Sequence, residues 1–361
     1  MTTFFIDPDI SKAETLSSEF YTDDKYFEAS KEKIFSRSWQ YVCDSDNIKI
    51  PGQLFPFTLL ENFLNDPLLL SRDKNDRLHC LSNVCTHRGN ILVEGNCIEK
   101  NIRCRYHGRR FDLDGKFISM PEFENVKNFP SKKDDLPEIP FSLWEKFLFV
   151  SLNPVAPVMN FTGDMCSRMS WLPLNEFVFE PSLSRDYLVN AHWALYCENY
   201  LEGFHIPYVH NSLNSVLDYS GYKTELFRYS NLQTGISKSG EDCFELPQNS
   251  PDFGQNISAY YFWIFPNMMF NFYPWGLSVN IVRPLKKNLT KVSFLTYVWK
   301  ESLMEKGAGS GLDKVEREDE AIVENVQKGI NSRLYDRGRY SASRETGTHH
   351  FHSLIAEFMN D

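Results

Sequence analysis

Two cysteines and two histidines form two short groups of metal-ligand type. Cys85 and His87 have one residue between them, and Cys104 and His107, sixteen residues further on, have two. Two thiolates and two imidazoles can hold a tetrahedral Zn²⁺, or a [2Fe-2S] cluster with one iron on the cysteines and the other on the histidines. Structural zinc sites usually pair cysteine with cysteine and histidine with histidine, whereas each group here supplies one of each. The pattern therefore differs from the usual structural zinc site, and both a zinc ion and an iron-sulfur cluster remain possible from the spacing alone.

A second group of ligand-type side chains lies near residue 200. Glu198, Glu202 and His205 are spaced by four and three residues, so a helix would place all three on one face. His210 would point elsewhere on an unbroken helix, but Pro207 kinks the segment and could bring the second imidazole round to the first. Two convergent histidines and a carboxylate would leave positions open on Fe(II) for O₂ and substrate.

The completing carboxylate is predicted in a charged helix near the C-terminus. An apolar stripe with steps of four, three and four residues is formed by Val315, Asp319, Ile322 and Val326. An acid on such a stripe needs a partner, and an iron would be one. Asp319 is therefore preferred as the third ligand over its neighbours Glu318 and Glu320, which point to different faces. Glu320 is the alternative ligand, and a solvated acid is the ordinary alternative to any metal role.

The elements that must position these side chains divide the chain into three predicted segments. Residues 1–38 include an amphipathic helix over about 24–38. Residues 39–155 contain short β-rich runs separated by Gly, Asn, Asp and Pro, which is typical of a small antiparallel β domain. A proline-rich connector at 154–157 leads into residues 156–361, which mix helices and strands.

The third segment is predicted to carry the second site on helices beside a sheet. Its helices span about 192–205 and 313–328, and its strands lie within 262–282 and 292–298. The whole chain is therefore predicted to be an α+β protein with antiparallel sheets.

Composition excludes several classes of protein. The 361 residues are 42% apolar and 15% aromatic, which can supply substantial cores in two or three domains. The net charge of −10 is not accompanied by a basic stripe, so nucleic acid is not expected as a partner. The most apolar stretch, 259–275, contains Pro266, Asn267, Asn271 and Pro274, which argues against a membrane span.

The location predicted from the sequence is cytoplasmic. The N-terminal MTTFFIDPDISKAETL lacks the basic start and continuous apolar segment of a secretory signal. Without such a signal, the eight cysteines are better interpreted as thiols and metal ligands than as a disulfide framework.

The first group of ligands resembles the cluster motif of Rieske proteins, and the surrounding CTHRG and CRYHGRRFDLDG extend the similarity. The ligands that this resemblance implies are Cys85, His87, Cys104 and His107. Rieske proteins usually have proline after the second cysteine and tryptophan after the His-Gly pair, where this chain has Arg105 and Arg109. Both departures leave the ligands intact, and they bear on the cluster's potential and on the surface that meets a redox partner.

The run NYLEGFHIPYVH resembles the iron-binding segment of Rieske oxygenase alpha subunits, in which an acid, a histidine and a second histidine are separated by two and four residues. The resemblance implies that His205 and His210 bind a mononuclear Fe(II). It also implies that Glu202, where aspartate is more common, bridges the cluster of one subunit to the iron of the next in a cyclic homotrimer.

The resemblance further implies a fold and an activity. Residues 39–155 would form an antiparallel β Rieske domain, residues 156–361 a helix-grip-like catalytic domain, and residues 1–38 a helical segment packed on the latter. The expected activity is that of a terminal oxygenase, which hydroxylates a small organic substrate with O₂. Its electrons would come ultimately from NAD(P)H through a separate ferredoxin or reductase and the Rieske cluster.

The expected substrate is a quaternary amine of the choline, betaine or carnitine type. NYLEGFHIPYVH and the C-terminal run around His349, His350 and His352 look similar to choline monooxygenase-like members. Aromatic side chains within 260–275 could hold a trimethylammonium group by cation–π attraction, although most are expected to fill a sheet core. The three C-terminal histidines are not expected to bind metal.

Other functions remain as alternatives. An aromatic-ring hydroxylase or dioxygenase, or an O-demethylase, would use the same two centres. A Rieske electron carrier would have no iron at His205 and His210, and would leave the spacing of Glu202 and the position of Asp319 unexplained. A structural zinc protein would not explain the second histidine pair.

Overall fold

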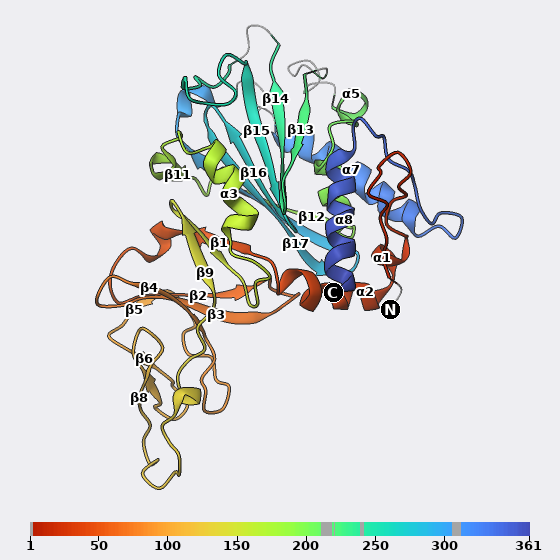
Figure 1. Cartoon of the computed structure of the whole chain (residues 1–361). Coiled ribbons are helices and arrows are strands. Elements are labelled where there is room, and N and C mark those ends of the chain that lie inside the picture. The colour runs from red at the N-terminus through yellow and green to blue at the C-terminus, as the bar shows by residue number, and fades with distance from the viewer. Residues whose placement is uncertain (1–2, 211–218, 220, 239–241, 305–311) are drawn as a thin grey trace. The chain divides into compact units, whose positions relative to one another are not determined.

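The structure is a computed structural model that describes residues 3–210, 219, 221–238, 242–304 and 312–361. Contacts between residues divide the chain into two compact units, Trp39–Val155 and the combination of Met1–Ser38 with Ala156–Asp361 (Figure 1). In the described part of the chain, no helix is long and apolar enough to cross a membrane. The α+β class with antiparallel sheets is confirmed.

The smaller unit is built from three small antiparallel sheets. Their strand orders are β1-β10-β9, β4-β3-β2-β5 and β6-β7-β8. The strands are β1 (Gln40–Asp44), β2 (Gln53–Leu59), β3 (Asp66–Arg72), β4 (Leu78–Ser82), β5 (Cys97–Ile98), β6 (Ile102–Arg103), β7 (Arg110–Phe111), β8 (Phe117–Ser119), β9 (Phe141–Trp144) and β10 (Phe147–Val150). Short helical turns lie at Ser45–Ile48 and Lys132–Asp134. A shared apolar core contains Leu69, Leu81 and Phe111 together with the buried thiols of Cys85 and Cys104.

The larger unit contains an eight-stranded antiparallel sheet. Its order is β11-β18-β17-β16-β15-β14-β13, and β12 also pairs with β18. The strands are β11 (Val178–Phe179), β12 (Arg185–Val189), β13 (Lys223–Leu226), β14 (Ser230–Ile236), β15 (Ile257–Ile264), β16 (Met268–Tyr273), β17 (Gly276–Lys286) and β18 (Leu289–Val298). Strands β15 to β17 are almost continuously buried, and β15 and β16 are accordingly apolar along most of their length.

Helices cover this sheet at several places (Figure 1). Helix α3 packs on β14 and β15, α4 on β17 and α7, and α8 on β13. The helices are α1 (Glu19–Thr22), α2 (Asp24–Ser30), a π-helical turn (Lys31–Phe35), α3 (Met159–Arg168), α4 (Trp193–Tyr200), α5 (Ile206–Val209), α7 (Leu312–Ile330) and α8 (Thr346–Asn360). Short turns lie at Leu174–Glu176 and Glu301–Leu303.

The helix predicted over about 192–205 is shorter than expected. Helix α4 begins after His192, whose Nδ1 accepts a hydrogen bond from the backbone of Ala194 at 3.3 Å. It ends at Tyr200, and the chain then turns before α5. The predicted strand region over 262–282 is likewise divided among β15, β16 and β17 by two tight turns.

The buried face of α7 differs from the predicted apolar stripe. Ile322 and Val326 are 37% and 43% exposed, so they do not belong to that face. The buried described side chains of the helix are Glu316, Val323, Gln327 and Ile330. Apolar spacing misplaced the stripe because this helix covers a polar site at its N-terminal end and turns polar groups inward there.

Candidate metal centres and substrate cavity

The break after α4 positions the acid and histidines of the second group. The backbone N–H of Leu201 still donates to Cys197 and Glu198, but residues 201–205 leave the helix before α5 starts. Pro207 was predicted to kink a longer helix. In the structure it instead occupies the first turn of α5, where the missing N–H of proline costs nothing. The turn from Leu201 to His205 therefore supplies the change of direction.

Glu198 was expected on the same face as Glu202 and His205, and this expectation is wrong. The Glu198 carboxylate accepts a hydrogen bond from Tyr21 Oη at 2.7 Å and lies 3.2 Å from His352 Nε2. The helix ends between Glu198 and Glu202, so the spacing of four residues no longer aligns them.

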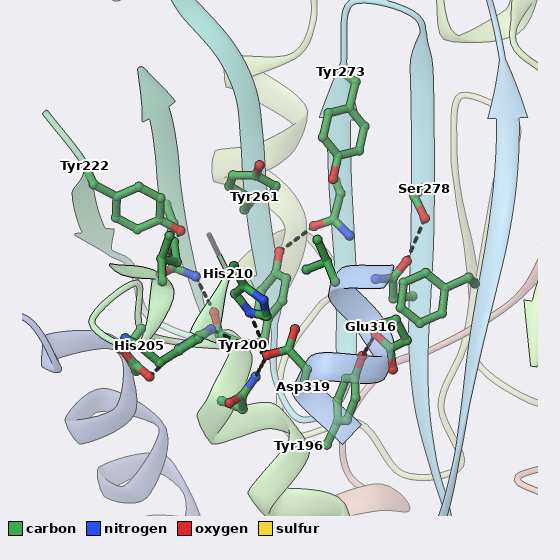
Figure 2. Close-up of a pocket in the computed structure, with 18 residues that line it drawn as sticks. Tyr196, Tyr200, His205, His210, Tyr222, Tyr261, Tyr273, Ser278, Glu316 and Asp319 are labelled. Atoms are coloured by element: carbon green, nitrogen blue, oxygen red, sulfur yellow. Dashed lines mark hydrogen bonds and ion pairs between the residues drawn. The ribbon is translucent and has the colours of Figure 1, made fainter. Parts of the chain in front are cut away.

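His205, His210 and Asp319 converge, as their predicted role requires (Figure 2). One ligand atom of each lies within 4.8 Å of the others. The Asp319 Oδ1 atom is 3.0 Å from His210 Nε2 and 3.5 Å from His205 Nε2. Glu320, the alternative ligand, is not part of this group among the described residues.

Two further carboxylates hold the outer nitrogens of these imidazoles. Glu202 Oε1 lies 2.6 Å from His205 Nδ1, and Glu318 Oε2 lies 2.8 Å from His210 Nδ1. A carboxylate at Nδ1 keeps the proton there and leaves the Nε2 lone pair for a metal. This donor set fits a divalent iron, since it is the two-histidine, one-carboxylate arrangement, with a carboxylate beside Nδ1 of each imidazole.

The electrostatics of the group also favour a cation. Burial lowers the pKa of His210, but the hydrogen bonds and charges of Asp319 and Glu318 outweigh it, so the pKa lies above its ordinary value. Three carboxylates thus surround two imidazoles in a partly buried place, and a metal ion would balance them.

Sequence reasoning missed Glu318 and Asn199. Glu318 was assigned to another face of α7, yet it joins the site because the His210 ring lies between it and Asp319 and meets each with one nitrogen. Asn199 Nδ2 donates to Asp319 Oδ1 at 2.7 Å and orients the carboxylate. The adjacent acids Glu318 and Asp319 were the available signal in the sequence. Their joint role cannot be inferred without the position of His210, whose two ring nitrogens face one acid each.

A cavity of about 120 Å³ opens beside the three converging residues (Figure 2). It is lined by five tyrosines, namely Tyr196, Tyr200, Tyr222, Tyr261 and Tyr273. Within the predicted aromatic segment 260–275, most rings fill the core as expected, and Tyr261 and Tyr273 reach the cavity. The tyrosines of α4 and Tyr222 before β13 were not predicted.

The first ligand group is also brought together. The rings of His87 and His107 are 4.9 Å apart between centroids, and the thiols of Cys85 and Cys104 are both buried. Burial raises the pKa of the Cys85 thiol, and the neighbouring Cys104 adds to this effect. Thiols held so close without a disulfide fit a shared metal cluster, which would bind both as thiolates.

The two loops that carry these ligands have the same backbone form. In the first, Gly89 N donates to Cys85 O, and in the second Gly108 N donates to Cys104 O, both at 3.0 Å. Both glycines have φ in the left-handed region, +72° and +76°, which other residues rarely adopt. Two matching turns therefore present a thiol and an imidazole each, as the paired motif predicted.

The two arginines that depart from the Rieske pattern lie in different surroundings. Arg105 is exposed, and its guanidinium is 4.0 Å from Glu94. Arg109 is 2% exposed and pairs with Asp134 at 2.7 Å, with its guanidinium 4.9 Å from the ring of Phe117. Arg109 thus fills the place of a large core side chain.

Two of the three C-terminal histidines have hydrogen-bond partners within the protein. His349 Nε2 lies 2.7 Å from the carbonyl of Asp7, and His352 lies between Tyr340 and Glu198. Burial lowers the pKa of His350 to about 4. In the described chain they join no group of metal-ligand atoms.

Comparison with known proteins defines the class. Residues 38–130 match the model of the Rieske [2Fe-2S] domain, and residues 168–361 match that of the catalytic domain of ring-hydroxylating alpha subunits. The chain therefore belongs to the family of Rieske non-heme iron oxygenases, as an alpha subunit with both domains.

Within this family, the chain is similar to oxygenases of quaternary amines. It is 31% identical to choline monooxygenase of Arabidopsis thaliana, over 96% of this chain and 83% of that protein. It is 28% identical to the carnitine monooxygenase oxygenase subunit of Escherichia coli, over 97% and 95%. The fold matches a quaternary ammonium Rieske monooxygenase in complex with L-carnitine, with a TM-score of 0.76, 24% identity and coverage of 98% and 97%.

Proposed function

We propose that this chain is a terminal oxygenase that hydroxylates a quaternary amine. The observation that carries the proposal is the tyrosine-lined cavity directly beside His205, His210 and Asp319. Aromatic faces attract quaternary ammonium groups, and the described lining contains no lysine or arginine that would repel one. The similarity to choline and carnitine monooxygenases supports the same substrate class.

Each centre has a distinct role in this proposal. Bound by His205, His210 and Asp319, Fe(II) would supply the site at which O₂ is activated beside the substrate. Glu202 and Glu318 hold the outer nitrogens of the histidines and fix their tautomers, while the cavity side chains position the substrate and exclude water.

The cluster would be held by the two matching loops of the smaller unit. The proposed ligands are Cys85, His87, Cys104 and His107. It would accept electrons from a ferredoxin or reductase, ultimately from NAD(P)H, and pass them to the iron. A cytoplasmic location, as predicted from the sequence, is part of the proposal, and the buried thiols of Cys85 and Cys104 fit a reducing compartment.

We also propose a cyclic homotrimer in which Glu202 connects the centres of neighbouring subunits. Glu202 Oε1 faces His205, and its side chain retains 14% exposure, so the carboxylate can accept a further hydrogen bond. One solved relative is described in terms of inter-subunit electron transfer, which supports the same arrangement here. A head-to-tail interface of this kind closes into a ring.

The test is a single turnover of reduced, iron-loaded protein with ¹⁸O₂ and a panel of amines, followed by mass spectrometry. Choline, glycine betaine and L-carnitine represent the proposed class, and naphthalene represents the ring-hydroxylating alternative. An oxidised amine product is expected, with ¹⁸O retained in the aldehyde when it is reduced to the alcohol before its oxygen exchanges with water, and it should be absent with His210→Ala protein that retains its cluster. Oxidation of naphthalene but of no amine would reject the proposed substrate class, and a lack of oxygen insertion into any substrate would favour an electron carrier.

A further inference from the structure

Glu316 has no role in holding the metal, yet it is buried in the wall of the cavity. It lies on α7 three residues before Asp319 and is 4% exposed. Its Oε2 accepts a hydrogen bond from Tyr196 Oη at 2.6 Å (Figure 2). Its other oxygen, Oε1, is buried and has no hydrogen-bond partner among the described residues.

A buried carboxylate with an unsatisfied oxygen is unfavourable unless something neutralises it. Burial raises the pKa of Glu316 to about 8, against the hydrogen bond from Tyr196, and the nearby charges of Asp319 and Glu320 add to the increase. These surroundings disfavour the charged form of this residue. A cation in the cavity, which Glu316 lines, would reverse that preference.

The other carboxylates of the cavity wall already have side-chain partners that belong to the proposed metal site. Glu202 is engaged by His205, and Asp319 by both histidines and Asn199. Glu316 is engaged only by a neutral hydroxyl. Among the described lining residues there is no lysine or arginine, so a carboxylate on the substrate would find no basic side chain there.

We propose that Glu316 recognises the positive charge of the substrate, and that the cavity selects monocationic amines over zwitterionic ones. A choline-like molecule, with a cationic head and a neutral tail, would leave no charge unpaired. A carnitine-like or betaine-like molecule would bring a carboxylate into a wall that already contains acids, and like charges in a desolvated place repel strongly. This inference rests on the proposed amine substrate and adds the residue and the charge type that determine specificity.

The competing explanation is that Glu316 is a structural acid, kept neutral by burial and held by Tyr196. The two explanations differ in what Glu316→Gln does. The amide has the same shape and can still accept from Tyr196, so a structural role would leave ligand preferences unchanged. A charge-recognition role would selectively weaken the binding of cations.

The experiment is isothermal titration calorimetry on oxidised, iron-loaded protein under anaerobic conditions, so that no turnover occurs. The ligands are choline, its neutral carbon isostere 3,3-dimethylbutan-1-ol, and L-carnitine. The wild-type protein is expected to prefer choline to the isostere, and to L-carnitine, by about tenfold or more, because the ammonium charge is attracted to the Glu316 carboxylate whereas the isostere has no charge and L-carnitine adds a repelled carboxylate. In Glu316→Gln protein the preference for choline over the isostere should fall to about threefold or less, with affinity for the isostere unchanged.

Glu320→Gln is the matched control, because Glu320 lies on the same helix, also has a buried unpartnered oxygen, and does not line the cavity. It should keep the wild-type preference. Three results would overturn the proposal: an unchanged choline preference in Glu316→Gln, equal binding of L-carnitine and choline by the wild type, or no binding of choline. Choline binding without oxygenation in the turnover assay would reject the proposed function and leave charge selection standing.

Discussion

Replacement of Arg109 by methionine should destabilise the smaller unit selectively. The side chain is 2% exposed and forms a 2.7 Å ion pair with Asp134, which is itself 19% exposed. Removing one partner of a fully buried pair costs about 3–5 kcal/mol. Asp134 remains partly exposed to solvent and keeps its hydrogen bonds from Ser131, so the expected loss in the free energy of unfolding is about 2–4 kcal/mol. For a cooperative unit of this size, that loss lowers Tm by about 8–16 °C.

The assay is thermal melting followed by visible circular dichroism of the bound cluster, which reports on the unit that contains Arg109. Arg110→Met is the control, since Arg110 is exposed and its Nε donates a hydrogen bond to Asn101 at 3.1 Å. That variant should change stability by no more than about 0.5 kcal/mol. If Arg109→Met protein melts within 2 °C of the Arg110→Met control, the buried ion pair is not a stabilising element and the reasoning fails.

Two other substitutions test the frame around the iron site. Burial, with the charge of Lys287, lowers the pKa of His192 to about 3. The folded protein therefore loses stability as pH falls below 6.5, by about 2 kcal/mol at pH 5. In His192→Asn protein, which keeps a helix-capping side chain, the drop in Tm between pH 7.5 and pH 5 should be smaller than in the wild type. An equal drop in the two proteins would contradict this. In Gly347→Ala, the new Cβ would lie 2.3 Å from the carbonyl oxygen of Leu201, so a loss of about 1–3 kcal/mol in the free energy of unfolding and weaker iron retention are expected. In Gly329→Ala the new Cβ meets no atom within 4 Å, so stability and iron retention should be unchanged. Equal iron content in the two variants would refute this.

Short-range patterns identified side chains that the fold brings together, because each pair of ligand-type residues lies within a few residues of chain. The two cysteine and histidine pairs required only two similar loops, and His205 and His210 required only one break in the backbone. Those local features were visible as spacing, and the structure brings each set together.

The wall of the cavity could not be predicted in the same way. The places of Glu316 and Glu318 depend on how α7 packs against α4, and the apolar spacing of α7 indicated the wrong face. Asp319 was therefore found for a reason that was only partly correct. The tyrosines come from separate elements, and only the fold brings them to one place.

The most direct test of the account is the content of iron and acid-labile sulfide per chain in anaerobically purified protein. Wild-type protein should contain about three irons and two sulfides, and His210→Ala about two of each, with an unchanged Rieske-type EPR signal after dithionite reduction. Cys104→Ser should lose the sulfide and that signal. Full iron content in His210→Ala would contradict the mononuclear site, and zinc without sulfide in the wild type would contradict the assignment of both centres.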